Sequence, residues 1–354
     1  MRIEGAVTRS IWVEPDGWAV GIFDQRLLPW QVERMVLREI GGAAVAIADM
    51  ATRGAPMIGA VAAYGLAFGL KADPSDEGLA ASCEQLRVTR PTAVNLLWAL
   101  ERVRRVVAPL PPAARAAAAH AEAGRICDED VAMNRAIGEG GLGLIRAIAA
   151  RKAGAPVNVL THCNAGWLAT VDWGTATAPL YLAHDEGIAL HVWVDETRPR
   201  NQGALTAFEL AGHGVPHSYI VDNAGGLLMQ QGAVDMVIVG TDRVTANGDV
   251  CNKIGTYLKA LAARAHGVPF YVALPSATYD PATATGADVP IEERSGKEVA
   301  FVAGEGGHKV RVTRSPVRNP AFDITPASLV TAYITEAGIA AGPEALAQLL
   351  AGQG

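Results

Sequence analysis

Residues 157–166 read Val-Asn-Val-Leu-Thr-His-Cys-Asn-Ala-Gly, and this stretch decides the fold class. The apolar run Val157–Leu160 is typical of a short buried strand, and the polar residues after it are typical of a loop. Similar apolar runs recur along the second half of the chain with helical segments between them, at Ala189–Val194, His217–Ile220, Met236–Val239 and Pro269–Ala273. This alternation predicts βαβ units and a parallel sheet within a domain that covers residues 151–354.

The first 150 residues have a different pattern and predict a mainly helical domain with a short β opening. Ile11–Val13 and Ala19–Phe23 predict two short strands around the turn Glu14–Gly17. Helical periodicity or composition then predicts helices at Trp30–Ile40, Gly42–Met50, Ala55–Leu70, Asp76–Val88, Ala93–Ala108 and Pro112–Ala150. We place the boundary between the two domains, 1–150 and 151–354, near Ala150–Pro156.

Composition limits the class of protein. The 354 residues are 50% hydrophobic and 19% charged, with a formal net charge of −6. A chain of this size can bury a large core, and its mild acidity argues against nucleic-acid binding. The opening Met1–Ala6 lacks the pattern of a secretory signal, and the apolar stretch Gly54–Leu70 is interpreted as a buried helix. We therefore expect a cytoplasmic protein without a membrane or nucleic-acid partner.

Reactive side chains follow the predicted strands. Ligands bind outside the carboxyl ends of the strands in open α/β sheets, so these positions mark a candidate site. Cys163 lies in a loop that enters a helix, where a thiol pKa is lowered, although a lone cysteine is also a common core residue. Asp195 and Asp222 fit capping or turn roles equally well. Asp242, beside Arg243, fits a helix cap or an ion pair as well as a catalytic role.

The cysteine and glycine patterns argue against a metal and a nicotinamide cofactor. None of the four cysteines forms a CxxC pair, and no GxGxxG sequence follows a predicted strand, so we expect neither a metal nor a nicotinamide cofactor. Lys253, near Gly255, fits a phosphate site at a helix start or an ordinary surface lysine. Arg53 precedes an apolar helix and needs either an anionic ligand or a salt bridge.

Several longer sequences occur in a fixed order along the chain. They are Arg53-Gly54-Ala55-Pro56, Thr161–Gly166, Glu196–Pro199 with Gln202-Gly203, Gly240–Arg243, Asn247–Asp249, Asn252–Thr256, Ile291–Arg294 and Asn319–Asp323. With these residues the chain closely resembles the methylthioribose-1-phosphate isomerase family of methionine salvage. That family shares a superfamily with the regulatory subunits of translation initiation factor 2B.

The resemblance implies a fold, a reaction and a set of site residues. The fold is a helical N-terminal domain followed by a Rossmann-like parallel-sheet domain, and the assembly is a homodimer. The reaction converts 5-methylthioribose 1-phosphate to the corresponding ribulose 1-phosphate, as part of methionine biosynthesis. The implied catalytic residues are Cys163 and Asp242. The implied substrate-binding residues are Arg53, Gly54, Ala55, Arg90, Gln202, Asn252 and Lys253.

These residue types suit the implied chemistry. The phosphate on the anomeric carbon prevents simple ring opening, so a general acid such as Asp242 has to protonate the ring oxygen. Cys163 then either carries the C2 proton as a thiolate or stabilises charge during a hydride shift to C1. Arg53, Arg90 and Lys253 would neutralise the phosphate, and Gln202 would bind sugar hydroxyls.

Two loops depart from the family's commoner pattern. Ala204 follows Gly203 where many relatives have an arginine, and Asn223–Gly226 replaces a Ser-Met-Ala-Ala sequence. These loops leave the group on C5 of the sugar open, with 5-deoxyribose 1-phosphate and ribose 1,5-bisphosphate as alternative substrates. A non-catalytic regulatory protein like the initiation factor subunits is a further alternative, which need not keep both Cys163 and Asp242.

Overall fold

The computed structural model describes residues 1–3, 5–91, 93–305 and 308–351. The chain divides into two compact units. Unit 1 comprises Met1, Val7–Ala132 and Trp167–Asp172, and unit 2 comprises Arg2–Ala6, Met133–Gly166 and Trp173–Gly354. The division falls within the long helix α5 (Pro112–Ala149), which contributes its first part to unit 1 and the remainder to unit 2. The boundary that the sequence places near Ala150–Pro156 stays a prediction.

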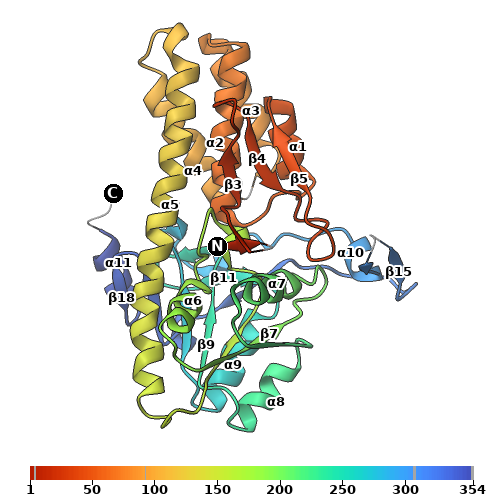
Figure 1. Ribbon diagram of the computed structural model, residues 1–354, viewed down its shortest axis with the longest axis vertical. Helices are drawn as coiled ribbons and strands as arrows, with labels where there is room; N and C mark the ends of the chain where they lie inside the picture. Colours follow the sequence, from red (N-terminus) through yellow and green to blue (C-terminus); the bar gives the residue numbers. More distant parts are fainter. Residues whose placement is uncertain (4, 92, 306–307, 352–354) are drawn as a thin grey trace. The chain divides into compact units, whose positions relative to one another are not determined.

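Unit 1 contains a three-stranded antiparallel sheet (Figure 1). Strands β3 (Ile11–Val13) and β4 (Val20–Phe23) form the predicted hairpin, and β5 (Arg34–Leu37) pairs with the other side of β4. The predicted helix at Trp30–Ile40 is therefore wrong. Because β4 is buried throughout, its backbone groups need hydrogen-bond partners on both sides, and this demand outweighs the local helical pattern.

The helices of unit 1 pack around α2 (Ala55–Ala72), which is almost fully buried. The surrounding helices are α1 (Ile40–Ala48), α3 (Asp76–Arg87), α4 (Val94–Val107) and the start of α5. Small residues let α2 approach its neighbours closely. A Cβ added at Gly59 would lie 2.9 Å from the Asn95 carbonyl oxygen of α4, and one at Gly65 would lie 2.9 Å from Ala43 of α1.

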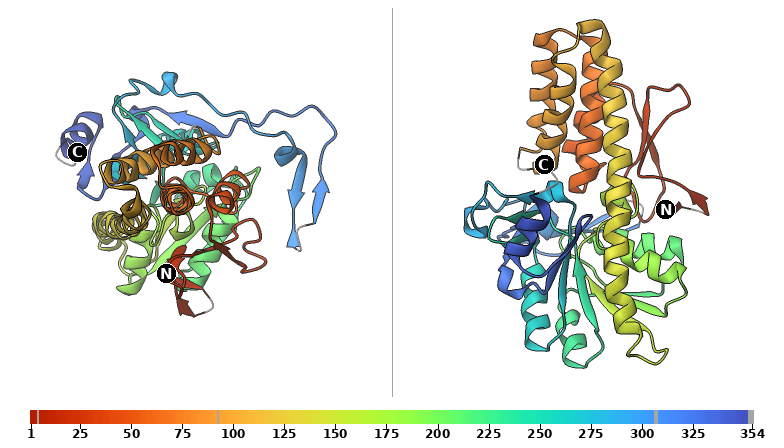
Figure 2. Two further views of the ribbon diagram at one scale, coloured as in Figure 1. Left: turned by 90° about the horizontal axis from the view of Figure 1, so that it is seen from above. Right: turned by 90° about the vertical axis from the view of Figure 1, so that its left-hand side faces the viewer.

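Helix α2 is also long and apolar enough to cross a membrane, the one helix in the described ranges that passes this test. Residues Met57–Leu70 are all buried within unit 1, and 78% of the apolar window is buried. This burial is typical of a core helix, as the sequence predicts. Figure 2 shows α2 lying among the other helices of unit 1.

Unit 2 is built on a seven-stranded sheet with the order β18-β17-β12-β9-β6-β7-β8. The strands are β6 (Val157–Thr161), β7 (Leu190–Asp195), β8 (His217–Ile220), β9 (Met236–Val239), β12 (Phe270–Ala273), β17 (Ala332–Thr335) and β18 (Gly338–Ala340). Each pair is parallel except β17 with β18. All five predicted strands are present, and the helices that connect or flank the strands are α6 (Ala178–Asp185), α7 (Gly203–His213), α8 (Ala224–Gln230), α9 (Thr256–Ala265) and α11 (Pro343–Leu350). The predicted fold class, helical N-terminal elements followed by a Rossmann-like parallel sheet, is confirmed.

The strand order gives this sheet a switch point between β6 and β9. From β6 the chain builds outward through β7 and β8, and it then returns to add β9, β12 and β17 on the opposite side. In sheets of this topology the loops after the two central strands diverge and leave a crevice in which ligands bind.

Unit 2 contains a second, four-stranded sheet with the order β13-β10-β11-β16, whose first strand in the sequence, β10, comes after β9. Its strands are β10 (Arg243–Thr245), β11 (Val250–Lys253), β13 (Tyr279–Asp280) and β16 (Phe322–Thr325). A turn that contains Asn247 and Gly248 joins β10 to β11, with Gly248 at φ +84°. A further hairpin of β14 (Phe301–Ala303) and β15 (Lys309–Arg311), beside α10 (Lys297–Ala300), extends away from the seven-stranded sheet (Figure 2).

Candidate active site

The loops that carry Cys163 and Asp242 leave neighbouring strands at the switch point. Cys163 lies two residues after β6, and Asp242 lies three residues after β9. A Cβ added at Gly240 would lie 2.5 Å from the Cβ of Ala165, so only glycine allows the two loops to approach this closely. The structure therefore brings the two predicted catalytic residues to one edge of the sheet in unit 2.

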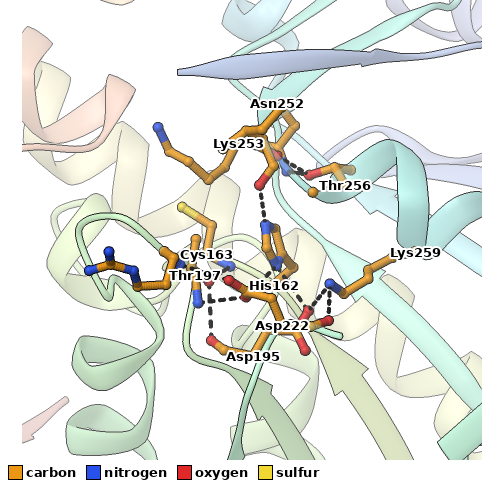
Figure 3. A network of polar contacts seen from close by, with 12 residues as sticks. His162, Cys163, Asp195, Thr197, Asp222, Asn252, Lys253, Thr256 and Lys259 are labelled. Atoms are coloured by element: carbon orange, nitrogen blue, oxygen red, sulfur yellow. Dashed lines mark hydrogen bonds and ion pairs between the residues drawn. The ribbon is translucent and has the colours of Figure 1, made fainter. Parts of the chain in front are cut away.

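Cys163 is held by its backbone. It is half-buried and adopts φ +69°, a left-handed conformation that is uncommon outside glycine. Its N–H donates to Thr197 Oγ1 at 2.8 Å, and its carbonyl oxygen accepts a hydrogen bond from Thr206 Oγ1 at 2.9 Å. Figure 3 shows its sulfur pointing away from the polar network below it, on the side of Lys253.

The residue before Cys163 belongs to a buried charged network (Figure 3). His162 Nδ1 lies 2.9 Å from Asp195 Oδ2, and His162 Nε2 lies 2.8 Å from the Ile254 carbonyl oxygen. Lys259 Nζ lies 3.0 Å from the same Asp195 oxygen and also donates to the backbone carbonyl of Asp222. This network joins the ends of β6, β7 and β8 to helix α9.

The two aspartates that the sequence left open have distinct roles in this network. Asp195 is fully buried and forms an ion pair with Lys259. Asp222 accepts the backbone N–H groups of Thr197 and Arg198 on its two carboxylate oxygens, both at 2.8 Å, which is a turn role.

The geometry of His162, Asp195 and Asp222 also invites a test as a metal site. One ligand atom from each lies within 4.8 Å of the others. The ammonium of Lys259, however, already bonds the Asp195 carboxylate and supplies the positive charge that a metal would bring. The donor set therefore fits an ion-pair network better than a metal centre.

Asp242 is half-buried in the short loop between β9 and β10. Its N–H donates to the Cys251 carbonyl oxygen at 3.0 Å, and the hydroxyl oxygen of Thr241 lies 2.9 Å from the carbonyl oxygens of both Arg243 and Cys251, to either of which it can donate. Arg243 forms an ion pair with Asp280 at 3.1 Å. These bonds fix the loop that presents Asp242.

Lys253 is a buried cation at the end of β11, only 4% exposed. Its Nζ donates to the Ala321 carbonyl at 3.0 Å and lies 4.5 Å from the ring centroid of Phe322. Burial lowers the pKa of Lys253, and Arg294 lowers it further, while Cys163 and Asp242 act in the opposite direction. The charge of Lys253 thus interacts with both predicted catalytic residues, and an additional anion would stabilise it.

Asn252 and the start of α9 are hydrogen-bonded to one another beside Lys253. Asn252 Nδ2 donates to Thr256 Oγ1 at 3.0 Å, and that hydroxyl donates to the Lys253 carbonyl at 2.7 Å. The carboxylate of Asp323 accepts the N–H groups of Gly255 and Tyr257 at 2.7 and 3.1 Å. Asp323 thus binds the first N–H groups of α9.

Gln202 lies at the start of α7, after β7, and its side chain is buried. Its Oε1 has no hydrogen-bond partner among the residues that the structure describes. Buried amide oxygens normally have a partner, so this atom is suited to accept a hydrogen bond from a ligand hydroxyl.

The other predicted binding residues belong to unit 1. Gly54 adopts φ +93° at the start of α2, and a Cβ added there would lie 2.2 Å from the Ala169 carbonyl oxygen. Arg53 precedes it and is buried, Ala55 is the first residue of α2, and Arg90 is half-buried between α3 and α4. Unit 2 gathers the remaining predicted residues, Cys163, Gln202, Asp242, Asn252 and Lys253.

Sequence reasoning did not find the residues that hold Cys163 in place. Thr197, Thr206 and Lys259 lie within ordinary loop and helix segments, and no spacing rule distinguishes them. The available signals for Thr197 were its position after a predicted strand and its place within the sequence Glu196–Pro199.

Comparison with known proteins shows the family to which this chain is similar. A model described as the initiation factor 2 subunit family matches residues 51–342. The methylthioribose-1-phosphate isomerase of Methylocella silvestris is 60% identical over 348 residues, which cover 96% of this chain and 95% of that protein.

Two solved structures share the fold over nearly the whole chain. The crystal structure of 5-methylthioribose 1-phosphate isomerase from Pyrococcus horikoshii OT3 matches with a TM-score of 0.85 and 39% identity, covering 98% of this chain and 96% of that one. The structure described as translation initiation factor eIF-2B, subunit delta, from A. fulgidus matches with a TM-score of 0.82 and 38% identity, covering 98% and 100%. On this evidence the chain belongs to the methylthioribose-1-phosphate isomerase family, within the initiation factor 2 subunit family.

Proposed function

We propose that the chain converts 5-methylthioribose 1-phosphate to 5-methylthioribulose 1-phosphate in methionine salvage, with Cys163 and Asp242 as its catalytic residues. The observation that carries the residue assignment is their placement after neighbouring strands at the switch point of the sheet. The charge of Lys253 interacts with both of them, which supports a common site.

Asp242 acts as the general acid and base. The substrate is a closed ring whose anomeric oxygen carries phosphate, so opening requires a proton on the ring oxygen. A half-buried carboxyl group on a loop fixed by Thr241 can deliver that proton and recover it later. Hydrogen then moves from C2 to C1, and the thiol of Cys163 acts beside these carbons.

Lys253 and Gln202 bind the substrate. A buried ammonium whose pKa is lowered by burial gains from a nearby phosphate dianion, and Lys253 offers such a charge. The buried Oε1 of Gln202 accepts a hydrogen bond from a sugar hydroxyl, and Asn252 supports Lys253 through Thr256. The binding roles that the family resemblance gives to Arg53, Gly54, Ala55 and Arg90 stay predictions.

A regulatory role like that of the initiation factor subunits is the alternative. It is favoured by the fold shared with the A. fulgidus protein at 38% identity. The 60% identity with the Methylocella silvestris isomerase favours the enzyme, and so does the presence of both Cys163 and Asp242 at the switch point.

The assignment of the catalytic pair is tested by Cys163→Ser and Asp242→Asn. Each variant should lose at least about 100-fold in kcat, because a positioned acid–base group contributes roughly that much or more. Cys83→Ser is the matched control, since Cys83 is also a half-buried free thiol but lies in α3 of unit 1. Near-normal turnover in both site variants, with unchanged circular dichroism, would show that the pair is wrongly assigned.

The cellular setting is part of the same proposal. The enzyme acts in the cytoplasm as a homodimer, which the family resemblance supports. The burial of α2 agrees with the first of these two statements only. Light scattering of the purified protein should give twice the mass of one chain, and a monomeric mass would contradict it.

A further inference from the structure

Two residues in left-handed conformations face each other at the candidate site. Cys163 has φ +69° and Thr197 has φ +60°. Neither is glycine, and Thr197 is β-branched, so both conformations are strained and persist only where the surroundings fix them. Strain of this kind concentrates at functional sites, which directs attention to the contact between the two residues.

The contact is a hydrogen bond through the Thr197 hydroxyl. Thr197 Oγ1 accepts the Cys163 N–H at 2.8 Å and donates to the Asp195 carbonyl at 3.1 Å. The side chain of Thr197 is fully buried. A second threonine, Thr206 of α7, donates its hydroxyl to the Cys163 carbonyl at 2.9 Å. Threonine hydroxyls therefore bond both backbone polar groups of Cys163.

Thr197 is itself anchored in the buried charged network. Its N–H donates to Asp222 Oδ1 at 2.8 Å, and the residue is tied through its hydroxyl to Asp195. Asp195 pairs with His162 and Lys259, and each of these three side chains is at most 5% exposed. Asp195 Oδ2 bonds both His162 and Lys259, so this buried network restrains Asp195. The Thr197 hydroxyl donates to the backbone carbonyl of Asp195, so the network can hold Thr197 and, through it, Cys163.

We propose that Thr197 is a positioning residue for catalysis, whose hydroxyl fixes the left-handed backbone of Cys163 and thereby aims the thiol at the substrate. This inference rests on the proposed function, in which Cys163 acts on the substrate. Thr197 does not touch the substrate in this account. The His162–Asp195–Lys259 network restrains Thr197, and Thr197 in turn restrains the loop after β6 through its bond to Cys163.

The first test compares Thr197→Val with Thr197→Ser. Valine keeps the size and β-branching of threonine but removes the hydroxyl, whereas serine keeps the hydroxyl. Displacement of a reacting group by about 1 Å can cost on the order of 100-fold in rate. We expect Thr197→Val to lower kcat at least tenfold with KM changed less than twofold, and Thr197→Ser to retain most of the wild-type kcat.

Thr335→Val provides the matched control. Thr335 is also fully buried, its Oγ1 donates to the Gly338 carbonyl at 3.0 Å, and it accepts the Ala337 N–H at 3.2 Å. It thus makes the same two kinds of bond at the end of β17. Thr335→Val should lower the unfolding temperature about as much as Thr197→Val does, while kcat stays within twofold of wild type.

A second readout is independent of turnover. The rate at which iodoacetamide alkylates Cys163 in the folded protein, followed by mass spectrometry of its peptide, reports the mobility of the loop. We expect a rise of at least threefold in Thr197→Val and none in Thr197→Ser or Thr335→Val. Thr206→Val, which frees the Cys163 carbonyl instead, should raise the rate as well and serves if Thr197→Val does not fold.

The outcomes separate this inference from the proposed function. If Thr197→Val keeps kcat within twofold and the alkylation rate of wild type, the positioning role is wrong. If wild-type protein does not turn over the sugar phosphate, the proposed function fails, while the alkylation contrast still decides whether Thr197 holds Cys163. In a Cys163→Ser background, Thr197→Val should cause no further loss of residual turnover, and an additive loss would overturn the inference.

Discussion

At the scale of one residue, the buried ammonium of Lys253 lowers the stability of the folded protein. Its ammonium is buried beside Phe322 and has one hydrogen bond, to the Ala321 carbonyl. Burial lowers its pKa, so the folded state binds this proton less tightly than the unfolded chain does. The contribution of Lys253 to stability therefore falls as pH drops from its ordinary pKa through its folded value. We therefore expect the buried charge of Lys253 to serve the substrate binding proposed above.

This reasoning predicts the behaviour of Lys253→Met. Methionine fills a similar volume without charge, and replacing buried ions by apolar residues is often neutral or stabilising. The variant should unfold within about 1 kcal/mol of wild type or be more stable, while turnover falls at least about tenfold. Denaturant unfolding and steady-state kinetics measure the two effects. A variant destabilised by several kcal/mol would mean that Lys253 serves the fold instead.

How much of the site the sequence predicts depends on the residue. Cys163 and Asp242 stand after strand-like runs, so their placement at one sheet edge follows from topology, and the structure agrees. The bond between Thr197 and Cys163 depends on positive φ at both residues, which no periodicity encodes. Lys259 reaches Asp195 from α9, a contact between elements that only the folded chain defines.

At the scale of one element, helix α10 is tied to the loop before α7 by a carboxylate. Glu298 accepts from Arg200 at 2.8 Å and from Asn319 Nδ2 at 2.9 Å. Burial raises the pKa of Glu298, but these hydrogen bonds outweigh burial and leave it lower than usual. A lowered carboxyl pKa stabilises the fold above the unfolded value of about 4.5, and this stability is lost as pH falls through the folded value.

Glu298→Gln should therefore be less stable than wild type at pH 7, by about 1 kcal/mol, because glutamine cannot pair with the Arg200 charge. The difference should shrink as pH falls below the ordinary glutamate pKa. Unfolding temperatures of both proteins measured from pH 7 to pH 3 check this, and a gap that widens toward low pH would contradict it.

The start of α2 depends on a glycine for two reasons. Gly54 has φ +93°, and a Cβ there would overlap the backbone of Ala169. Gly17 in the β3–β4 turn has φ +73° but open space around its Cα. Gly17→Ala should cost about 1 kcal/mol from backbone strain alone, and Gly54→Ala should cost at least about 2 kcal/mol more from the collision. Equal losses in denaturant unfolding would show that the space around Gly54 adjusts.

Elements were predictable where the pattern was local. The strands of the sheet with helices between them were found because each is a compact apolar run followed by polar residues. Strand β17 was missed because no single crossover helix links it to β12, and the chain between them contains β13, α10, β14, β15 and β16 instead. Strand β5 was taken for a helix because only its pairing with β4 decides its conformation.

At the scale of the whole molecule, we infer the reaction from the family and the location of the candidate site from the strand order of the sheet. The order β8-β7-β6-β9-β12-β17 sets the switch point between the loops of Cys163 and Asp242. Similarity over 96% to 98% of the chain to isomerases, including one 60% identical, covers both units. The sequence departures at Ala204 and Asn223 fall in α7 and before α8, beside the strand ends of the same sheet.

The most direct measurement follows the purified protein by NMR with 5-methylthioribose 1-phosphate, 5-deoxyribose 1-phosphate and ribose 1,5-bisphosphate supplied separately. The account predicts that the methylthio substrate gives its ketose with the highest kcat/KM. It also predicts that Cys163→Ser and Asp242→Asn lower this conversion at least about 100-fold while Cys83→Ser does not. Absence of ketose from all three sugars with folded wild-type protein, or full activity in both site variants, would contradict the account.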